Sequence, residues 1–176
     1  CHNSMEIWDK IEYYDLSGPQ QIPKVEVPFC DKWESPYEEE FPTLHKLFKS
    51  DDEVERYWVS TCYEKLQDKF DTNGYGIYHE HKNYLARLEE EADIKKTIGE
   101  ALHTNMFAYP VTLKHYTDMF WECGSVVGAG RGSSCSGLNH YLLGITQLDP
   151  IKWEFPFWRY LNKERFELGD IDLDLC

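Results

Sequence analysis

The sequence has 176 residues, which suits one or two domains, and its 41% hydrophobic content, with 12 tyrosines, 9 phenylalanines and 6 tryptophans, is enough for a packed core. It contains no run of eighteen apolar residues and begins with polar and charged residues, so we expect neither a membrane-spanning helix nor a signal peptide. A formal net charge of −14 argues against nucleic acid as the partner of the chain as a whole.

The acidic excess belongs mainly to the first part of the chain. Residues 1–100 contain 12 basic and 23 acidic residues, whereas residues 101–176 contain 6 and 9. Three of the nine acidic residues in the second part are Asp170, Asp172 and Asp174. A polyanionic partner therefore remains compatible with the second part.

The cysteines indicate free thiols. Six of them are spread over the chain, and no pair has the C-x-x-C spacing of a zinc or redox motif. We therefore expect a reducing, cytoplasmic location. The chain begins with Cys1 rather than methionine, from which we expect an excerpt of a longer polypeptide.

The first seventy residues are predicted to form helices on both sides of an extended linker. Apolar residues recur at helical spacing over residues 2–16, and a proline-punctuated linker follows to about Pro42. Ser50 and Glu53 form a capping box, with Ser50 as the N-cap residue. This box predicts a helix that continues to about Phe70.

Two further helices are predicted downstream. One covers residues 82–103, with the three glutamates at 89–91 facing water. Residues 106–109 are predicted to form a short strand. A helix over residues 111–123 then begins after a proline and ends at Gly124.

Residues 125–137 contain a glycine-rich turn between a brief strand and a helix predicted over residues 134–143. Glycines let a backbone approach a ligand, and a helix start with serine hydroxyl groups suits a phosphate, with Arg131 adding a positive charge. The turn lacks the lysine of a P-loop and the glycine spacing of a dinucleotide fingerprint. We favour phosphate binding over a flexible linker.

A basic and aromatic segment follows at residues 157–165 and contains Arg159 and Arg165. Taken alone, these are two surface arginines. They gain a functional role only if the glycine-rich loop and the acidic segment after them form one site.

The acidic segment, residues 170–175, alternates acidic and apolar residues, which predicts a strand with Asp170, Asp172 and Asp174 on one face. Like charges on one face weaken a strand, and a divalent cation bound between them would offset their repulsion. An edge strand that is protected from pairing by its charges gives the same pattern. Alternation does not choose among the three aspartates. A phosphate-binding loop followed by D-x-D is the chemistry of nucleotidyl transfer with two Mg²⁺ ions, or Mn²⁺ in their place.

Four motifs in this order resemble the bacterial C-family replicative DNA polymerases, the DNA polymerase III alpha subunits. They are residues 128–134, 143–150, 159–165 and 170–174, with a weaker match upstream. The resemblance implies a fragment that runs from the end of the PHP domain into the palm domain of such a polymerase.

The fold that this resemblance implies is α+β. A helical N-terminal part would lead into the first portion of a polymerase-β-like nucleotidyltransferase palm. Residues 1–45 would be the end of the PHP domain and the proline-rich linker, and residues 46–176 the N-terminal part of the palm.

The resemblance also implies roles for site residues. The incoming nucleotide's phosphates would be bound by Arg131, Gly132, Ser133, Arg159 and Arg165. Asp172 and Asp174 would be the catalytic residues that hold Mg²⁺ or Mn²⁺. Gly169 stands where this family usually has a proline, which would leave the entry to the acidic strand less rigid.

The partners implied by the resemblance are primer–template DNA, deoxynucleoside triphosphates, the remainder of the polymerase chain and, through parts outside this chain, a sliding clamp. No membrane is involved. The family's third catalytic aspartate would lie beyond residue 176, so we expect the isolated chain to be inactive in DNA synthesis.

Two other interpretations remain open from the sequence. In one, the chain is a non-catalytic structural or scaffold segment whose aspartates only blunt an edge strand. In the other, it is a small stand-alone nucleotidyltransferase, which would need a further carboxylate from Asp149 or Glu154.

Overall fold

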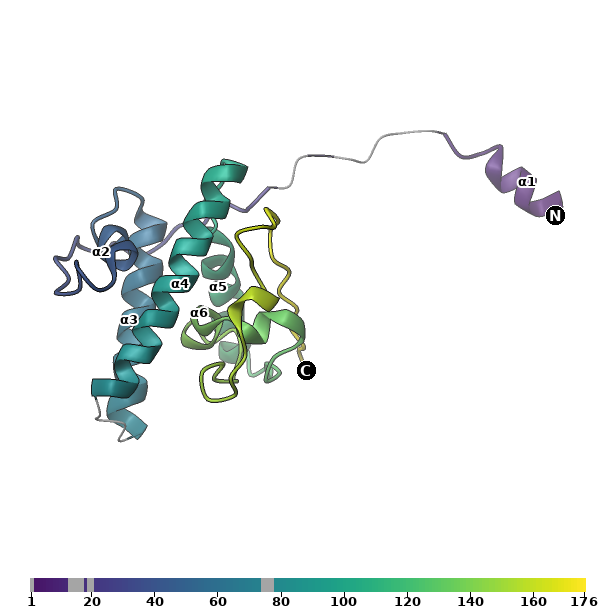
Figure 1. Cartoon of the computed structure of the whole chain (residues 1–176). Helices are drawn as coiled ribbons and strands as arrows, with labels where there is room; N and C mark the ends of the chain where they lie inside the picture. The colour runs from purple at the N-terminus through teal and green to yellow at the C-terminus, as the bar shows by residue number, and fades with distance from the viewer. Residues whose placement is uncertain (1, 13–17, 19–20, 74–77) are drawn as a thin grey trace.

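The computed structural model describes residues 2–12, 18, 21–73 and 78–176, and the regular secondary structure of this part of the chain is helical (Figure 1). In chain order the elements are α1 His2–Trp8, α2 Pro42–Phe48, α3 Glu53–Asn73, α4 Tyr78–Leu102, α5 Ala108–Glu122, the 3₁₀ helix η1 Gly132–Ser136, α6 Leu138–Leu142 and the 3₁₀ helix η2 Phe157–Arg159. No helix in the described ranges has the length and apolar character that crossing a membrane requires.

Two long helices, α3 and α4, line the centre of the hydrophobic core and confirm the two long helices predicted for this region. Helix α3 packs against α2, α5 and α6, while α4 packs against α2 and α6. At the centre, Trp58 of α3 meets Phe107 edge to face, with ring centroids 4.8 Å apart. The buried members of this core are Phe41, Leu44, Leu47, Phe48, Trp58, Val59, Cys62, Leu66, Phe70, Leu85, Leu88, Ala92, Phe107, Val111, Leu138, Leu142, Leu143, Ile145 and Ile171.

A smaller buried cluster joins α4 to the C-terminal part of the chain. It contains Ile94, Ile98, Met106, Phe157 and Leu161. Because Phe157 and Leu161 belong to the basic and aromatic segment, this cluster anchors that segment to α4.

The N-terminus of α3 is capped by a different residue from the one predicted. The Oδ1 atom of Asp52 accepts hydrogen bonds from the N–H groups of Val54 and Glu55, at 2.8 and 3.2 Å. Ser50 instead donates its hydroxyl to Oε2 of Glu55 at 2.6 Å. The N-cap residue is therefore Asp52 and not Ser50, so the predicted capping box was wrong. A carboxylate next to the helix start is well placed to accept from the free amide groups there.

The three glutamates at 89–91 do not share one environment. Only Glu90 is exposed, while Glu91 is fully buried and Glu89 is half-buried. Both carboxylate oxygens of Glu89 accept backbone N–H groups at the start of α2, from Thr43 at 2.7 Å and Leu44 at 2.8 Å. The prediction that all three face water was wrong, because short helices leave amide groups that need acceptors.

Helix α5 begins three residues before its predicted start, so the short strand predicted over residues 106–109 was wrong. The side chain of Asn105 accepts the N–H of Phe107 at 2.8 Å, and this turn leads directly into the helix. Pro110 lies in the first turn, where its missing N–H costs no hydrogen bond. Gly124 follows the helix with φ of +77°, as predicted for its terminating residue.

The first forty residues are less regular than predicted. Helix α1 ends at Trp8, well short of the predicted residue 16, and residues 13–16 lie outside the described part of the chain. Helix α1 stands apart from the other helices (Figure 1). Residues 21–35 have no regular secondary structure, as predicted for the linker, but α2 then begins at Pro42 and was not predicted.

The strands predicted around the glycine-rich loop are not formed. The described residues contain only two isolated antiparallel bridges, Val127 with Leu175 and Asn162 with Arg165. Residues 170–175 are extended but pair at one position, because their aspartates repel one another and disfavour a strand. The helices of the α+β expectation are therefore confirmed, and its palm-like sheet is not confirmed by the described residues.

The helix predicted over residues 134–143 is divided into η1 and α6 by Gly137, whose backbone is extended. A Cβ atom at Gly137 would lie 2.5 Å from Nδ1 of His140, so a side chain there would collide with the buried imidazole. Glycine thus allows the chain to change from one short helix to the next.

Candidate functional site

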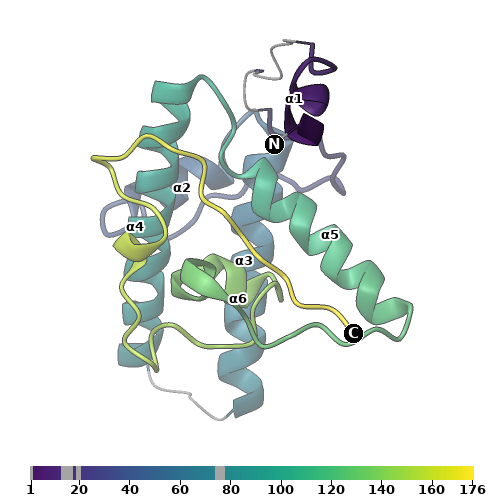
Figure 2. The same ribbon diagram turned by 90° about the vertical axis from the view of Figure 1, so that its right-hand side faces the viewer.

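The glycine-rich loop and the acidic segment form one site. The N–H of Gly128 donates to the carbonyl oxygen of Asp174 at 2.8 Å, and the N–H of Cys176 donates to the carbonyl oxygen of Val126 at 3.1 Å. Figure 2 shows the C-terminal segment crossing in front of α3 between α5 and α6, and ending beside the chain that follows α5. From the sequence, Arg159 and Arg165 gain a functional role only if the glycine-rich loop and the acidic segment come together. The structure brings these two segments together.

Arg131 connects the loop to two aspartates. Its guanidinium lies 2.9 Å from Oδ1 of Asp172 and 3.4 Å from Oδ1 of Asp174. The hydrogen bond that Arg131 donates to Asp172, followed by the charges of both aspartates, raises the pKa of Arg131. Since all three side chains are about half exposed, the pairs themselves contribute little to stability.

The loop adopts a conformation that requires glycine. Gly130 has φ of +139° and Gly132 has φ of +67°, and a Cβ at Gly130 would lie 2.7 Å from Sγ of Cys135. Gly132 faces the acidic segment, because its Cβ position is 3.6 Å from Oδ2 of Asp172. The hydroxyl of Ser134 donates to the carbonyl oxygen of Arg131 at 2.7 Å and closes the turn.

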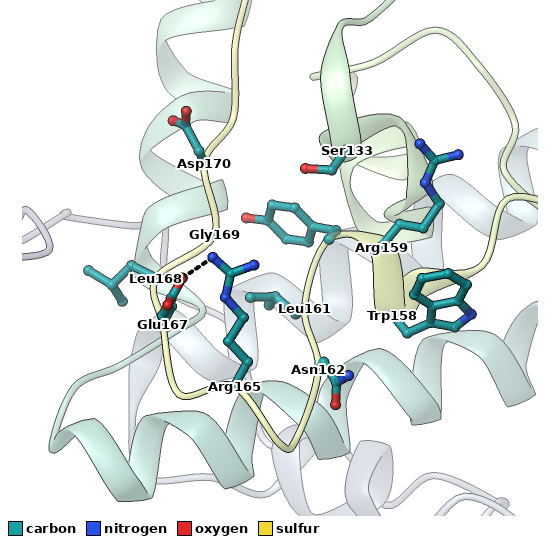
Figure 3. A pocket seen from close by; sticks show the side chains of 11 residues that line it. Ser133, Trp158, Arg159, Leu161, Asn162, Arg165, Glu167, Leu168, Gly169 and Asp170 are labelled. Atoms are coloured by element: carbon teal, nitrogen blue, oxygen red, sulfur yellow. Dashed lines mark ion pairs between the residues drawn. The ribbon is translucent and has the colours of Figure 1, made fainter.

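A cavity of about 210 Å³ lies beside this cluster (Figure 3). Four residues singled out in the sequence line it: Ser133, Arg159, Arg165 and Asp170. In Figure 3, Ser133 and Arg159 stand on one side of the cavity, and Asp170 stands on the other. Two cationic side chains and a serine hydroxyl suit an anionic ligand of the size of a phosphate group.

Arg165 is already paired within this cavity. Its guanidinium lies 2.6 Å from a carboxylate oxygen of Glu167, and this contact raises the pKa of Arg165 (Figure 3). Both side chains are exposed, at 74% and 59%. An anionic ligand would therefore compete with Glu167 for Arg165.

The predicted site residues thus fall into two adjoining groups. Arg131 and Gly132 meet Asp172 and Asp174, whereas Ser133, Arg159 and Arg165 surround the cavity with Asp170. The groups adjoin because Gly132 and Ser133 are consecutive. Asp170, which alternation could not separate from the other two aspartates, differs from them by facing the cavity.

Gly169 has a packing role that the sequence did not suggest. A Cβ atom at this position would lie 2.4 Å from Cζ of Tyr160, whose ring packs against the hydrophobic core. Burial raises the pKa of the Tyr160 hydroxyl far above its ordinary value. Tyr160 and Glu167 line the cavity and were not predicted as site residues, although Tyr160 lies within the basic and aromatic segment.

The two carboxylates beside Arg131 are of the kind that binds a divalent cation. Carboxylate oxygens are the ligands that Mg²⁺ prefers, and Asp172 and Asp174 both face Arg131, so a cation can take the place of its guanidinium. No group of three His, Cys, Asp or Glu side chains suited to a metal occurs among the described residues. Asp149 does not add a third ligand, because its carboxylate accepts the hydroxyl of Tyr84 at 2.5 Å and two N–H groups of the following turn.

Comparison with known proteins gives one consistent family. Residues 56–176 match the family described as the bacterial DNA polymerase III alpha NTPase domain. The chain is 33% identical over 178 residues to the probable DNA polymerase YorL of Bacillus subtilis strain 168, an alignment that covers 98% of this chain and 14% of that protein.

Cellular replicative subunits also match. The DNA polymerase III subunit alpha of Aquifex aeolicus is 33% identical over 126 residues, which is 72% of this chain and 10% of that protein. The corresponding subunit of Staphylococcus aureus is 42% identical over 91 residues, 52% of this chain and 8% of that protein. The chain therefore spans about a tenth of the length of these curated relatives, and it belongs to the bacterial DNA polymerase III alpha family, the C-family DNA polymerases.

Proposed function

We propose that this chain is part of a template-directed DNA polymerase that adds deoxynucleotides to a primer 3′ end by two-metal nucleotidyl transfer. In this assignment residues 1–45 end the PHP domain and form the linker, and residues 46–176 begin the palm. The observation that carries the proposal is the pairing of Arg131 with Asp172 and Asp174, which joins a phosphate-type loop to two carboxylates.

Each side chain has a defined task in this proposal. Asp172 and Asp174 would hold Mg²⁺, or Mn²⁺, together with a further acidic ligand supplied by the rest of the polymerase. When bound, these ions make the primer 3′ oxygen a better nucleophile towards the α-phosphorus and neutralise the pyrophosphate that leaves. Arg131 would leave the aspartates and turn towards the phosphates.

The cavity would receive the phosphate groups. Ser133 with the N–H groups of its turn, together with Arg159, would contact oxygens of the triphosphate, and Arg165 would exchange Glu167 for the same anion. Primer–template DNA, deoxynucleoside triphosphates, the rest of the polymerase and a sliding clamp bound elsewhere on it are the proposed partners.

Binding of Mn²⁺ and dATP to the 176-residue chain tests this proposal by calorimetry. The double variant Asp172→Asn with Asp174→Asn should weaken Mn²⁺ binding at least about tenfold, since it removes both carboxylate charges. The matched control is Asp93→Asn, an exposed aspartate on α4 that pairs with Lys163. Unchanged Mn²⁺ and dATP affinity in the double variant would favour the scaffold interpretation instead.

A further inference from the structure

A buried ion pair on α4 lies behind the phosphate-type loop. Arg87 and Glu91 are one helical turn apart, and Nε of Arg87 is 3.2 Å from Oε1 of Glu91. The Glu91 side chain is fully buried and that of Arg87 is 13% exposed. Charged side chains are rarely buried in this way unless hydrogen bonds satisfy them.

Glu91 holds the start of α6, the helix that follows the loop. Its Oε1 accepts the N–H of Leu138 at 2.6 Å, and its Oε2 accepts the N–H of Asn139 at 2.9 Å and the Asn139 side-chain amide at 2.7 Å. Burial raises the pKa of Glu91, and the hydrogen bonds from Asn139, the charge of Arg87 and the hydrogen bond from Leu138 oppose this by favouring the carboxylate.

Arg87 holds two chain segments that are far apart in sequence. One terminal nitrogen, Nη2, donates to the carbonyl oxygen of Ser136 at 2.9 Å and to that of Phe155 at 2.6 Å. Ser136 ends η1, which contains Ser133, and Phe155 precedes the segment that contains Arg159. The same guanidinium therefore ties together the two segments that bring Ser133 and Arg159 to one side of the cavity.

The loop itself has few other attachments to the interior. Behind it, Nδ1 of His140 contacts the carbonyl oxygen of Ser134 at 2.8 Å, and both residues are buried. A five-residue 3₁₀ helix followed by a five-residue α-helix cannot hold its own geometry by internal hydrogen bonds. Its shape depends on acceptors and donors provided by α4.

We infer that Arg87 and Glu91 are positioning residues that fix the spacing between Ser133 and Arg159, and thereby set the affinity of the site for a polyphosphate. This inference rests on the proposed function, because it assigns a purpose to the spacing of the same cavity. Neither side chain lines the cavity, so both act through the backbone that they hold.

The test compares triphosphate with monophosphate binding in the 176-residue chain. The Kd values for dATP and dAMP are measured with Mg²⁺ by calorimetry in the wild type and in Glu91→Gln. Glutamine keeps the shape but turns an amide donor towards an N–H group, so the preference for dATP over dAMP should fall about tenfold. A change that only loosened the fold would weaken both nucleotides alike and leave this ratio constant.

Two further variants make the result decisive. Arg87→Lys keeps the charge but not the forked donors, so it should reduce the ratio as well, whereas Glu100→Gln on the exposed side of α4 should leave it unchanged. If circular dichroism shows that Glu91→Gln no longer unfolds cooperatively, the affinity ratio of Arg87→Lys alone decides whether the positioning role holds. A ratio unaffected in the folded variants overturns the positioning role.

Failure of the proposed function gives a different outcome. If the wild-type chain shows no preference for dATP over dAMP, or if Ser133→Ala does not reduce that preference, the cavity is not the phosphate site and the positioning role falls with it. If Ser133→Ala reduces the preference and Glu91→Gln does not, only the positioning role is overturned.

Discussion

At the scale of single residues, His140 shows how the interior is adapted to a neutral imidazole. It is fully buried, and its Nε2 has no hydrogen-bond partner within the described part of the chain. Burial, with the charge of Lys95 adding to it, lowers the pKa of His140 to about 3. The folded protein therefore excludes a proton that the unfolded chain accepts below about pH 6.5.

This difference predicts acid sensitivity. Because the folded-state pKa is depressed, the stability is fully present above pH 6.5 and is lost as the pH falls towards 3. In His140→Gln, whose side-chain amide can donate to Ser134, this loss should disappear. We expect the difference in unfolding free energy between wild type and variant to change by about 3 kcal/mol between pH 7 and pH 4, measured by urea unfolding. A difference that stays constant over this range would contradict the prediction.

A second residue-scale prediction concerns Gly169. Its Cβ position lies 2.4 Å from Cζ of Tyr160, so Gly169→Ala should destabilise the protein by about 1–3 kcal/mol through overpacking. In a Tyr160→Leu background most of this cost should vanish, which a double-mutant cycle of urea unfolding measures. Gly18→Ala, where a Cβ would meet open space, is the control and should change stability by less than about 0.5 kcal/mol.

The sequence allowed the chemistry of the site residues to be predicted better than their contacts. Glycine, serine and arginine in one loop indicate an anion site by composition, but the partners of Arg131 depend on a segment some forty residues away. The role of Gly169 depends on the ring of Tyr160, and no local pattern contains that distance.

At the scale of elements, one glutamate of α4 serves as the cap of another helix. Glu89→Gln should lower stability by about 1 kcal/mol, because one of the two amide groups of α2 at Thr43 and Leu44 then faces a donor instead of a carboxylate oxygen. Glu90→Gln, one residue further on and half exposed, is the matched control and should change stability by less than about 0.5 kcal/mol. Equal effects of the two substitutions, measured by urea unfolding, would exclude the capping role.

Long periodic elements were predictable and short ones were not. Helices α3 and α4 follow from apolar periodicity that extends over several turns. Helix α2 is seven residues long and takes its cap from Glu89, so its own sequence contains no start signal beyond Pro42. The strand predicted at residues 170–175 did not form. Alternation of acidic and apolar residues favours an extended chain, but it cannot supply the neighbouring strand that a sheet needs.

At the scale of the whole molecule, the proposed two-metal reaction needs more acidic ligands than the described residues bring together. The described residues place Asp172 and Asp174 together but provide no group of three metal-binding side chains. We therefore expect no primer extension by the isolated 176-residue chain with Mg²⁺ or Mn²⁺. Incorporation of labelled deoxynucleotide that is abolished by Asp172→Asn would contradict this prediction.

The pairing of residues 126–128 with residues 174–176 has a consequence for how long the site stays assembled. Two backbone hydrogen bonds join segments that are about fifty residues apart, so this contact is among the easiest to open without global unfolding. In hydrogen exchange, the amide protons of Gly128 and Cys176 should exchange much faster than those in the middle of α3 and α4. A triphosphate that bridges the loop and the aspartates should slow these two protons in particular, so the lifetime of the closed site becomes a measurable reporter of substrate.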